Sequence, residues 1–301
     1  MSAPQPRSSE IGLIGLGLMG NALAERMLVA GLTLHGYDLS ASARDAFAAR
    51  GGRAADSAHA LFSRCGVVIL SLPSHEETAV VLAAAREHFQ PDTILIDTTT
   101  GDPSAANGFA GELAGRGMTY LDATISGSST HVRNGTAVMM VGGEPGAFSR
   151  VHGVLNLIAA EVFYTGPSGT GSRMKLVTNV VLGLNRAALA EGLVLAESLG
   201  LDAAQALAVM RAGPAYSRMM DTKGEKMLRR DYVPEARLAQ HLKDVRLILA
   251  QANAAGVQLP LSEAHQKVLE RAEAAGLGGA DNSALIEVLR ARGTPPISSS
   301  P

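Results

Sequence analysis

The sequence predicts an α/β domain with a doubly wound, mostly parallel sheet, followed by an all-α domain. In the first half, short apolar runs alternate with amphipathic stretches, as buried strands covered by helices on both faces require. After Gly166 the strand signal stops, and the apolar residues recur at helical period. We therefore predict domains over residues 11–166 and 167–293, with polar, disordered ends at 1–10 and 294–301.

Seven apolar runs of the first half are the predicted strands. Several are apolar throughout, which is typical of strands buried on both faces, and the stretches between them supply the helices. The runs are residues 11–14, 32–37, 67–72, 94–98, 119–125, 137–141 and 162–164.

The second half begins with one long predicted helix over residues 169–199, roughly 45 Å at about 1.5 Å per residue. This interdomain helix would join the two domains. Gly, Pro or Asp separates the helices that follow. They are predicted over 202–211, 215–228, 235–255, 260–275 and 283–290.

The composition is that of an ordinary globular protein, with 47% hydrophobic residues and 26 Lys and Arg against 28 Asp and Glu. Without a block of like charge, neither nucleic acid nor an anionic membrane is an expected partner. Cys65 is the only cysteine, so an internal disulfide is excluded, and no histidine spacing indicates a metal site. With no signal-peptide core and no uninterrupted apolar run of about 18 residues, we expect a cytoplasmic protein.

A glycine-rich loop follows the first predicted strand and opens an amphipathic stretch. Gly15, Gly17 and Gly20 stand at G-x-G-x-x-G spacing. In that context the first glycine permits a tight turn, the second lets a pyrophosphate approach, and the third brings helix against strand. We predict a Rossmann-type dinucleotide site there, formed by Gly15, Leu16, Gly17, Leu18, Met19 and Gly20.

Asp38 ends the second predicted strand, 18 residues after Gly20. A carboxylate at about this spacing binds the adenosine ribose hydroxyls and repels a 2′-phosphate, so NAD is favoured. Arg44 can neutralise such a phosphate, and NADP is therefore not excluded. The alternative is that Asp38 serves only as a turn residue or cap.

Five motifs in order resemble the β-hydroxyacid dehydrogenase family, which includes 3-hydroxyisobutyrate dehydrogenase and tartronate semialdehyde reductase and is related to 6-phosphogluconate dehydrogenase. The resemblance extends from Ile11 to about Leu289. The motifs are GLGLMG, SLP at 71–73 with DTTT at 97–100, DATISGSSTHVRNGTAVMMVGG at 122–143, the glycine motif of 166–171 with Lys175 and Asn179, and HLKD at 241–244.

The resemblance implies an oxidoreductase and assigns its site. Leu72, Pro73 and Thr100 would contact the cofactor, with Lys243 near the nicotinamide. Ser126, Gly127 and Ser128 would hold the carboxylate of a small substrate, since successive backbone N–H groups and a hydroxyl form an anion cradle. Lys175 would be the catalytic lysine.

The expected reaction passes a hydride between NAD(H) and a small 3-hydroxy acid or its semialdehyde, with Lys175 as general acid and base. Lys175 and Asn179 are four residues apart, so they share one helix face and can address one substrate oxygen. Burial or a second cation such as Lys243 would help an ammonium to give up its proton at neutral pH. The alternatives are a solvated Lys175 and a surface pair between Lys243 and Asp244.

Departures from the family pattern leave the substrate open. Thr124 replaces Pro, Ser128 replaces Gly, and His131 and Val132 replace Gly and Ala. His131 is either a specificity contact or an exposed loop residue. Ala236 stands where a Phe is common, which would enlarge the pocket.

Three further predictions complete the interpretation. Asp281 fits a helix N-cap better than a contact near the active site. Apolar surface on the helical half favours a homodimer or homotetramer. The alternative functions are an imine reductase of the same architecture, a group that generally lacks this lysine, and a non-catalytic NAD-binding protein.

Overall fold

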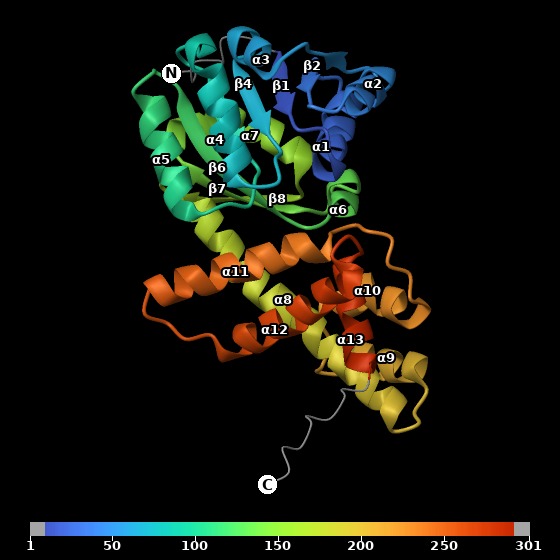
Figure 1. Ribbon diagram of the computed structural model, residues 1–301. Helices are drawn as coiled ribbons and strands as arrows, with labels where there is room; N and C mark the ends of the chain where they lie inside the picture. The colour runs from blue at the N-terminus through green and yellow to red at the C-terminus, as the bar shows by residue number, and fades with distance from the viewer. Residues whose placement is uncertain (1–9, 292–301) are drawn as a thin grey trace. The chain divides into compact units, whose positions relative to one another are not determined.

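The computed structural model describes residues 10–291, and the predicted disordered ends lie almost wholly outside this range (Figure 1). The chain divides into two compact units, residues 1–177 and 178–301. The division falls inside helix α8 (Thr170–Ser198), which is continuous, although the change of sequence pattern comes earlier, at Gly166.

The N-terminal unit is built on one eight-stranded sheet of order β3-β2-β1-β4-β5-β6-β7-β8. All neighbouring strands are parallel except β6 and β7, which are antiparallel. The predicted fold class is confirmed. The strands are β1 (Ile11–Ile14), β2 (Leu34–Tyr37), β3 (Arg53–Ala54), β4 (Val67–Leu70), β5 (Ile94–Asp97), β6 (Thr119–Ser126), β7 (Val138–Gly143) and β8 (Glu161–Gly166).

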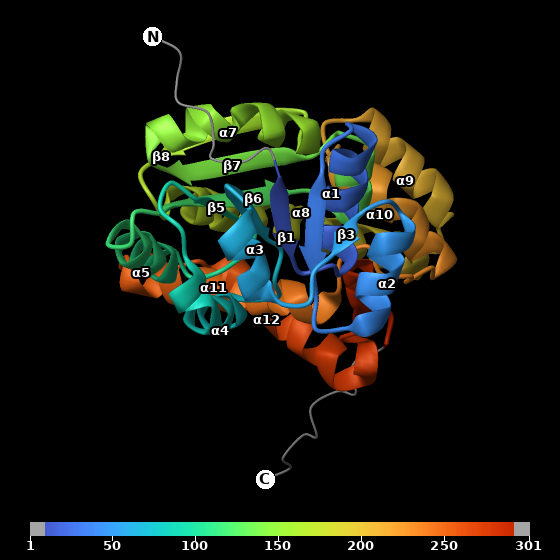
Figure 2. The same cartoon turned by 90° about the horizontal axis from the view of Figure 1, so that it is seen from above.

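Helices cover both faces of this sheet (Figure 2). They are α1 (Leu18–Val29), α2 (Ala41–Ala49), α3 (Ala58–Arg64), α4 (His75–Ala85), α5 (Pro103–Ala114), α6 (Ser129–Arg133) and α7 (Pro145–Ile158), with a short 3₁₀ turn η1 (Arg86–His88). Successive residues of β4 show the two faces. Val67 and Ile69 pack in the core with α1 and α7, whereas Val68 and Leu70 pack in the core with α3, α4 and α5. Full burial on both faces is the reason that these runs are apolar throughout.

Sequence analysis missed one strand, β3. It has only two residues, both exposed, and lies at the edge of the sheet beside β2. A strand this short has no apolar period to detect.

The C-terminal unit is helical as predicted. It contains most of α8 and then α9 (Ala203–Ala212), α10 (Arg218–Arg229), α11 (Leu238–Ala254), α12 (Pro260–Ala272), a π turn η2 (Glu273–Leu277), a 3₁₀ turn η3 (Asn282–Leu285) and α13 (Ile286–Arg290). Its core centres on Leu193, Met227, Leu242 and Leu285. The predicted helix at 235 begins only at Leu238, and the backbone N–H of Glu235 donates to the Asp281 carboxylate.

Within residues 10–291, α8 is the one helix long and apolar enough to cross a membrane by length and composition. Only 39% of its most apolar window is buried. The core helix of a soluble protein passes the same test, so this is weak evidence for a membrane span.

Candidate active site

The glycine loop after β1 has the geometry that a dinucleotide requires. Gly15 has a φ of +94°, and a Cβ there would lie 2.3 Å from the Ser71 carbonyl oxygen. A Cβ on Gly20 would lie 1.9 Å from the Gly15 carbonyl oxygen, so helix and loop pack too closely for any side chain. A Cβ on Gly17, in contrast, would meet no atom within 4 Å. Backbone is thus accessible at Gly17, where a pyrophosphate has to approach.

The loops after β1 and β4 meet where the strand order reverses, which is where open α/β sheets bind their ligands. The Ser71 N–H donates to the Ile14 carbonyl at 2.9 Å, and the Leu72 N–H donates to Thr99 Oγ1 at 3.3 Å. The segments that carry Leu72, Pro73 and Thr100 are therefore tied together at the carboxyl edge of the sheet. In the glycine loop itself, Leu16 is buried whereas Leu18 is 46% exposed.

Asp38 contacts the glycine loop directly. One of its carboxylate oxygens accepts the Leu16 N–H at 2.7 Å, and the other accepts the Ser40 N–H at 2.8 Å. The second bond is the turn role considered above, and the first places the carboxylate beside the predicted nucleotide site. Arg44 does not pair with this carboxylate: its Nη1 donates to the carbonyls of Asp38 and Leu39 at 2.6 and 3.2 Å.

Asp97, the first residue of the DTTT motif, orders the neighbouring loop. Its buried carboxylate accepts from the Thr99 N–H at 2.9 Å, the Tyr120 hydroxyl at 3.0 Å and the Thr78 hydroxyl at 3.3 Å. Burial raises the pKa of Asp97 despite these donors. The sequence motif alone did not reveal this structural role.

The glycine motif before Lys175 lets α8 begin directly against the sheet. The N–H groups of Gly169 and Ser172 donate to the two carboxylate oxygens of Asp122, at 2.8 and 2.7 Å. A Cβ on Gly171 would lie 2.3 Å from the Asp122 carbonyl oxygen. The Thr124 hydroxyl donates to the Gly171 carbonyl at 2.9 Å, which gives a role to one of the departures from the family pattern. Burial raises the pKa of Asp122.

Lys175 is one turn further along α8, and the residue is only 9% exposed. Its Nζ donates to the Ile125 carbonyl at 2.6 Å, immediately before Ser126. Because β1, β4, β5 and β6 are parallel, the ends of β6 and β1 lie at the same edge of the sheet. The amine is therefore at the edge that carries the glycine loop, and the solvated alternative does not describe it.

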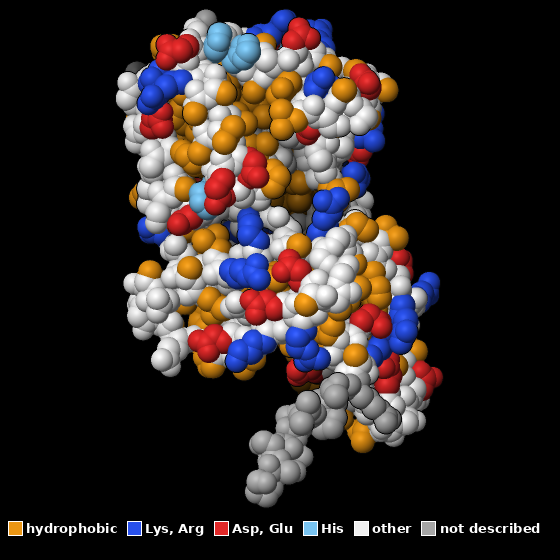
Figure 3. All heavy atoms as spheres, in the orientation of Figure 1, with side chains coloured by type: hydrophobic (Ala, Val, Ile, Leu, Met, Phe, Trp, Pro, Cys, Tyr) orange, Lys and Arg blue, Asp and Glu red, His pale blue; other side chains and the backbone are white. Residues whose placement is uncertain are grey.

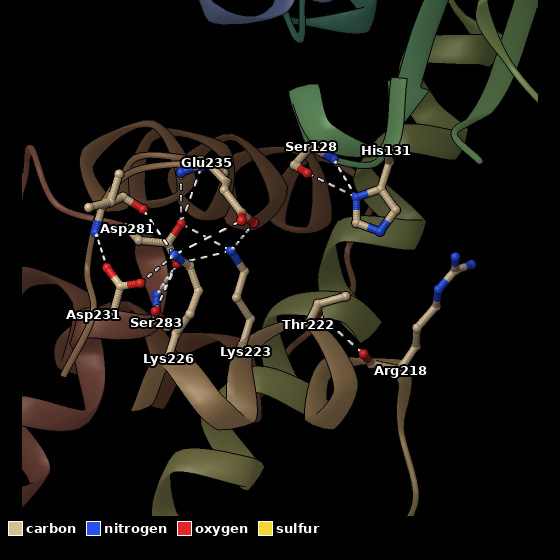
Figure 4. A network of polar contacts seen from close by, with 12 residues as sticks. Ser128, His131, Arg218, Thr222, Lys223, Lys226, Asp231, Glu235, Asp281 and Ser283 are labelled. Atoms are coloured by element: carbon tan, nitrogen blue, oxygen red, sulfur yellow. Dashed lines mark hydrogen bonds and ion pairs between the residues drawn. The ribbon is translucent and has the colours of Figure 1, made fainter. Parts of the chain in front are cut away.

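The predicted substrate loop, 126–128, is bonded to α6. Gly127 has a φ of +139°. The Ser128 N–H donates to His131 Nδ1 at 3.2 Å, and Ser128 Oγ lies 2.9 Å from the same nitrogen (Figure 4). The two residues form a capping box at the start of α6. His131 is thus not merely an exposed loop residue.

In the C-terminal unit, Asp244 brings two predicted site residues together. Asn179 Nδ2 donates to Asp244 Oδ2 at 3.1 Å, and Lys243 Nζ lies 3.4 Å from Asp244 Oδ1. The pair between Lys243 and Asp244 that we considered as an alternative is therefore formed. Sequence analysis did not identify Asp244 as the partner of Asn179, because the pairing joins residues far apart in the chain.

Asp281 caps the turn that follows it, since its carboxylate accepts the Ser283 N–H at 3.1 Å. It also binds Lys223, with Nζ 3.0 Å from both carboxylate oxygens (Figure 4). Burial alone would raise the pKa of Asp281, but Lys223 and Ser283 hold it below its usual value. Within residues 10–291, no group of three or more His, Cys, Asp or Glu side chains could hold a metal ion.

Two family models match successive parts of the chain. Residues 10–166 match the family model for the NAD-binding domain of 6-phosphogluconate dehydrogenase. Residues 169–289 match the model for the NAD-binding part of NADP-dependent 3-hydroxyisobutyrate dehydrogenase.

Among individual proteins, the L-threonate dehydrogenase of Cupriavidus necator is 33% identical over 285 residues, which are 93% of this chain and 96% of that protein. The crystal structure of a 3-hydroxyisobutyrate dehydrogenase from Salmonella typhimurium has a TM-score of 0.87 at 27% identity, covering 93% of this chain and 100% of that one. A Streptomyces aurantiacus imine reductase is more distant. It has a TM-score of 0.66 at 22% identity, over 93% of this chain and 99% of that one, and so shares the fold alone.

A doubly wound sheet with a glycine-rich loop where the strand order reverses is the architecture of dinucleotide-binding proteins. The chain belongs to the β-hydroxyacid dehydrogenase family. It is an NAD(P)-dependent dehydrogenase or reductase that acts on the CH–OH group of hydroxy acids.

Proposed function

We propose that the protein passes a hydride between NAD(H) and a small 3-hydroxy acid or its semialdehyde, with Lys175 as general acid and base. The observation that carries this proposal is the bond from Lys175 Nζ to the Ile125 carbonyl. It holds a buried amine at the end of β6, next to the loop proposed to bind the substrate carboxylate. The glycine loop lies at the same edge of the sheet.

The residues fit a dinucleotide. Of the three motif glycines, only Gly17 has no neighbouring atom within 4 Å of where a Cβ would lie, so a pyrophosphate can approach its backbone. When bound, the cofactor supplies or accepts the hydride. The protein has to move the proton and orient the substrate. The Ile125 carbonyl can only accept a hydrogen bond, so it orients the Lys175 amine without taking its proton. Asn179, fixed by Asp244, would orient the substrate oxygen and exchanges no proton itself.

Activity assays with matched variants test the catalytic role. Nicotinamide absorbance is followed with a panel of hydroxy acids, semialdehydes and cyclic imines. Lys175→Ala should lower kcat by about 10²- to 10⁴-fold. Lys175→Arg should not restore it, since a guanidinium keeps the charge but cannot release a proton. The exposed Lys267→Ala is the control and should behave as wild type.

The two alternative functions give different outcomes in the same assay. Imine turnover that survives Lys175→Ala would indicate an imine reductase. Cofactor binding with no turnover of any substrate would indicate a non-catalytic NAD-binding protein. Either result would refute the proposed function.

The proposed cofactor preference is NAD over NADP, with NADP not excluded. The Asp38 carboxylate is fixed by the Leu16 and Ser40 N–H groups beside the glycine loop, and it would repel a 2′-phosphate. Arg44 donates hydrogen bonds to backbone carbonyls of the same turn. If NADP binds, Arg44 would be the cation that neutralises its 2′-phosphate.

The proposed assembly is a homodimer or homotetramer, located in the cytoplasm. An apolar groove of about 350 Å³ lies between α8 and α9 of the C-terminal unit. It is lined in part by Leu195, Leu199, Leu201 and Val209, each more than half exposed. A second copy would remove this surface from water. Positive and negative side chains are interspersed on the face shown in Figure 3, which does not favour nucleic acid or an anionic membrane as a partner.

A further inference from the structure

We propose that His131 determines substrate specificity by fixing the hydrogen-bonding role of Ser128. With Ser128 fixed in this way, the loop after β6 would favour 3-hydroxy acids that carry a hydrogen-bond donor on C2, the carbon next to the carboxylate. This inference rests on the proposed function, in which the loop binds the carboxylate end of the substrate. His131 is then a positioning residue that acts through Ser128.

The direction of the hydrogen bonds follows from one contact. A backbone N–H can only donate, so His131 Nδ1 accepts from Ser128 and carries no hydrogen. In the neutral ring the hydrogen is therefore on Nε2. Ser128 Oγ, 2.9 Å from the same Nδ1, must then donate its hydroxyl hydrogen to the ring.

Both donors of Ser128 are thereby directed to the imidazole. A carboxylate offers only acceptors, so in this state it gains no hydrogen bond from Ser128, and Ser126 and Gly127 are the residues of the predicted loop left to hold it. In the capping box the backbone N–H of His131 also donates to Ser128 Oγ. One lone pair of the Ser128 hydroxyl then remains to accept a hydrogen bond from the substrate. That lone pair suits a hydroxyl or an ammonium group of the substrate.

In the proposed site, Ser128 would lie next to C2 of a short substrate. Lys175, proposed to act on the C3 oxygen, is held at the Ile125 carbonyl, three residues before Ser128. His131 packs closely on the loop between them, since a Cβ on Gly127 would lie 2.9 Å from the His131 Cβ. C2 lies between the carboxylate and the reacting carbon, so its substituent is the group that Ser128 would meet.

The test is a substrate series that differs only at C2. It comprises 3-hydroxypropionate, 3-hydroxyisobutyrate, glycerate and serine, which carry hydrogen, methyl, hydroxyl and ammonium there. In the wild type, kcat/KM should be about tenfold higher for glycerate or serine than for the first two. His131→Ala should lower this ratio about three- to tenfold, because the released Ser128 hydroxyl can rotate and no longer holds a lone pair toward the C2 substituent.

Further variants separate this role from a structural one. His131→Gln should keep the ratio, because a glutamine at this helix position also accepts the cap N–H. Ser128→Ala should lower the ratio like His131→Ala, and the double variant should lower it no further. Thr130→Ala, an exposed side chain on the same short helix, is the control and should leave the ratio unchanged.

Two results would overturn the inference. One is a substrate ratio that does not change in His131→Ala while turnover still depends on Lys175. The other is an equal fall in kcat/KM for all four substrates, which would indicate a merely structural cap. Turnover that survives Lys175→Ala would count against the proposed function, and this inference would fall with it.

Discussion

Lys175 owes its position to residues that take no part in the proposed chemistry. The Asp122 carboxylate fixes the first N–H groups of α8, and the Ile125 carbonyl orients the amine. Gly171 allows the helix to approach the strand. At the scale of single residues, the proposed catalytic amine and its supports are therefore encoded separately, in segments about 50 positions apart in the chain.

Asp38 gives a prediction about the cofactor. Asp38→Asn removes the charge but keeps an oxygen that can accept the Leu16 N–H. The repulsion of a 2′-phosphate should fall, so kcat/KM for NADP relative to NAD should rise about tenfold or more. Steady-state kinetics with both cofactors measures the ratio.

The control for this change is Asp45→Asn on α2, which removes an exposed carboxylate and should leave the ratio as it is. Adding Arg44→Ala to Asp38→Asn should abolish the gain. If Asp38→Asn leaves the cofactor ratio unchanged, Asp38 is only a turn residue.

At the scale of elements, the contact between α8 and the strands β6 and β7 positions the lysine. A Cβ on Gly171 would lie 2.7 Å from the Met140 carbonyl oxygen, as well as close to Asp122. These are backbone atoms, which cannot move aside as a flexible side chain can. The approach of helix to sheet is thus fixed by the glycine itself.

Gly171→Ala should therefore destabilise the protein by about 1–3 kcal/mol and lower kcat as the Lys175 amine is displaced. Denaturant unfolding and turnover measure the two effects. Gly108→Ala in α5 is the matched control, because a Cβ there meets nothing within 4 Å. That change should be neutral or stabilising by up to about 1 kcal/mol. Equal stability of the two variants would show that the close contact at Gly171 is not rigid.

The packing of α12 against α8 gives a pH dependence. Burial and then the Arg186 guanidinium lower the pKa of His265 from 6.5 to about 4. Between these two pH values the unfolded chain binds a proton that the folded protein does not. The free energy of unfolding should therefore fall as pH decreases from about 6.5 to about 4, by up to about 3 kcal/mol from this group.

His265→Gln should remove that contribution. The slope of unfolding free energy against pH should become shallower than in the wild type across this window. His59→Gln, at an exposed position, is the control. An unchanged slope in His265→Gln would mean that the folded protein binds this proton as readily as the unfolded chain.

At the scale of the whole molecule, exposed apolar side chains on one side of α8 predict self-association. Leu199→Glu should place a charge in the groove between α8 and α9, and a buried charge without a partner is strongly unfavourable. The variant should be monomeric, or dissociate at a higher protein concentration than the wild type. Light scattering after size exclusion measures the mass. Val29→Glu, exposed on α1 of the other unit, is the control, and a wild-type mass for Leu199→Glu would refute this interface.

Much of the sheet could be predicted, because strands buried on both faces must be apolar throughout, whereas the edge strand β3 carries no such pattern. The glycine loop was likewise predictable, since its glycine spacing is required by the backbone geometry of a few neighbouring residues. The partners of Asp122, Asn179 and His265 were not predictable from the sequence. Each partner comes from a distant segment and is specified only when the chain folds.

By itself, the sequence determined the order of the elements and the glycine loop, because these depend on local period and spacing, whereas Lys175 was singled out by resemblance to a known family. Only the tertiary structure decided that the Lys175 amine is held at the end of β6 and that Asn179 donates to Asp244. The reason is that a hydrogen bond depends on direction as well as composition. Direction is set by how helices such as α8 pack on distant segments, which no local pattern records.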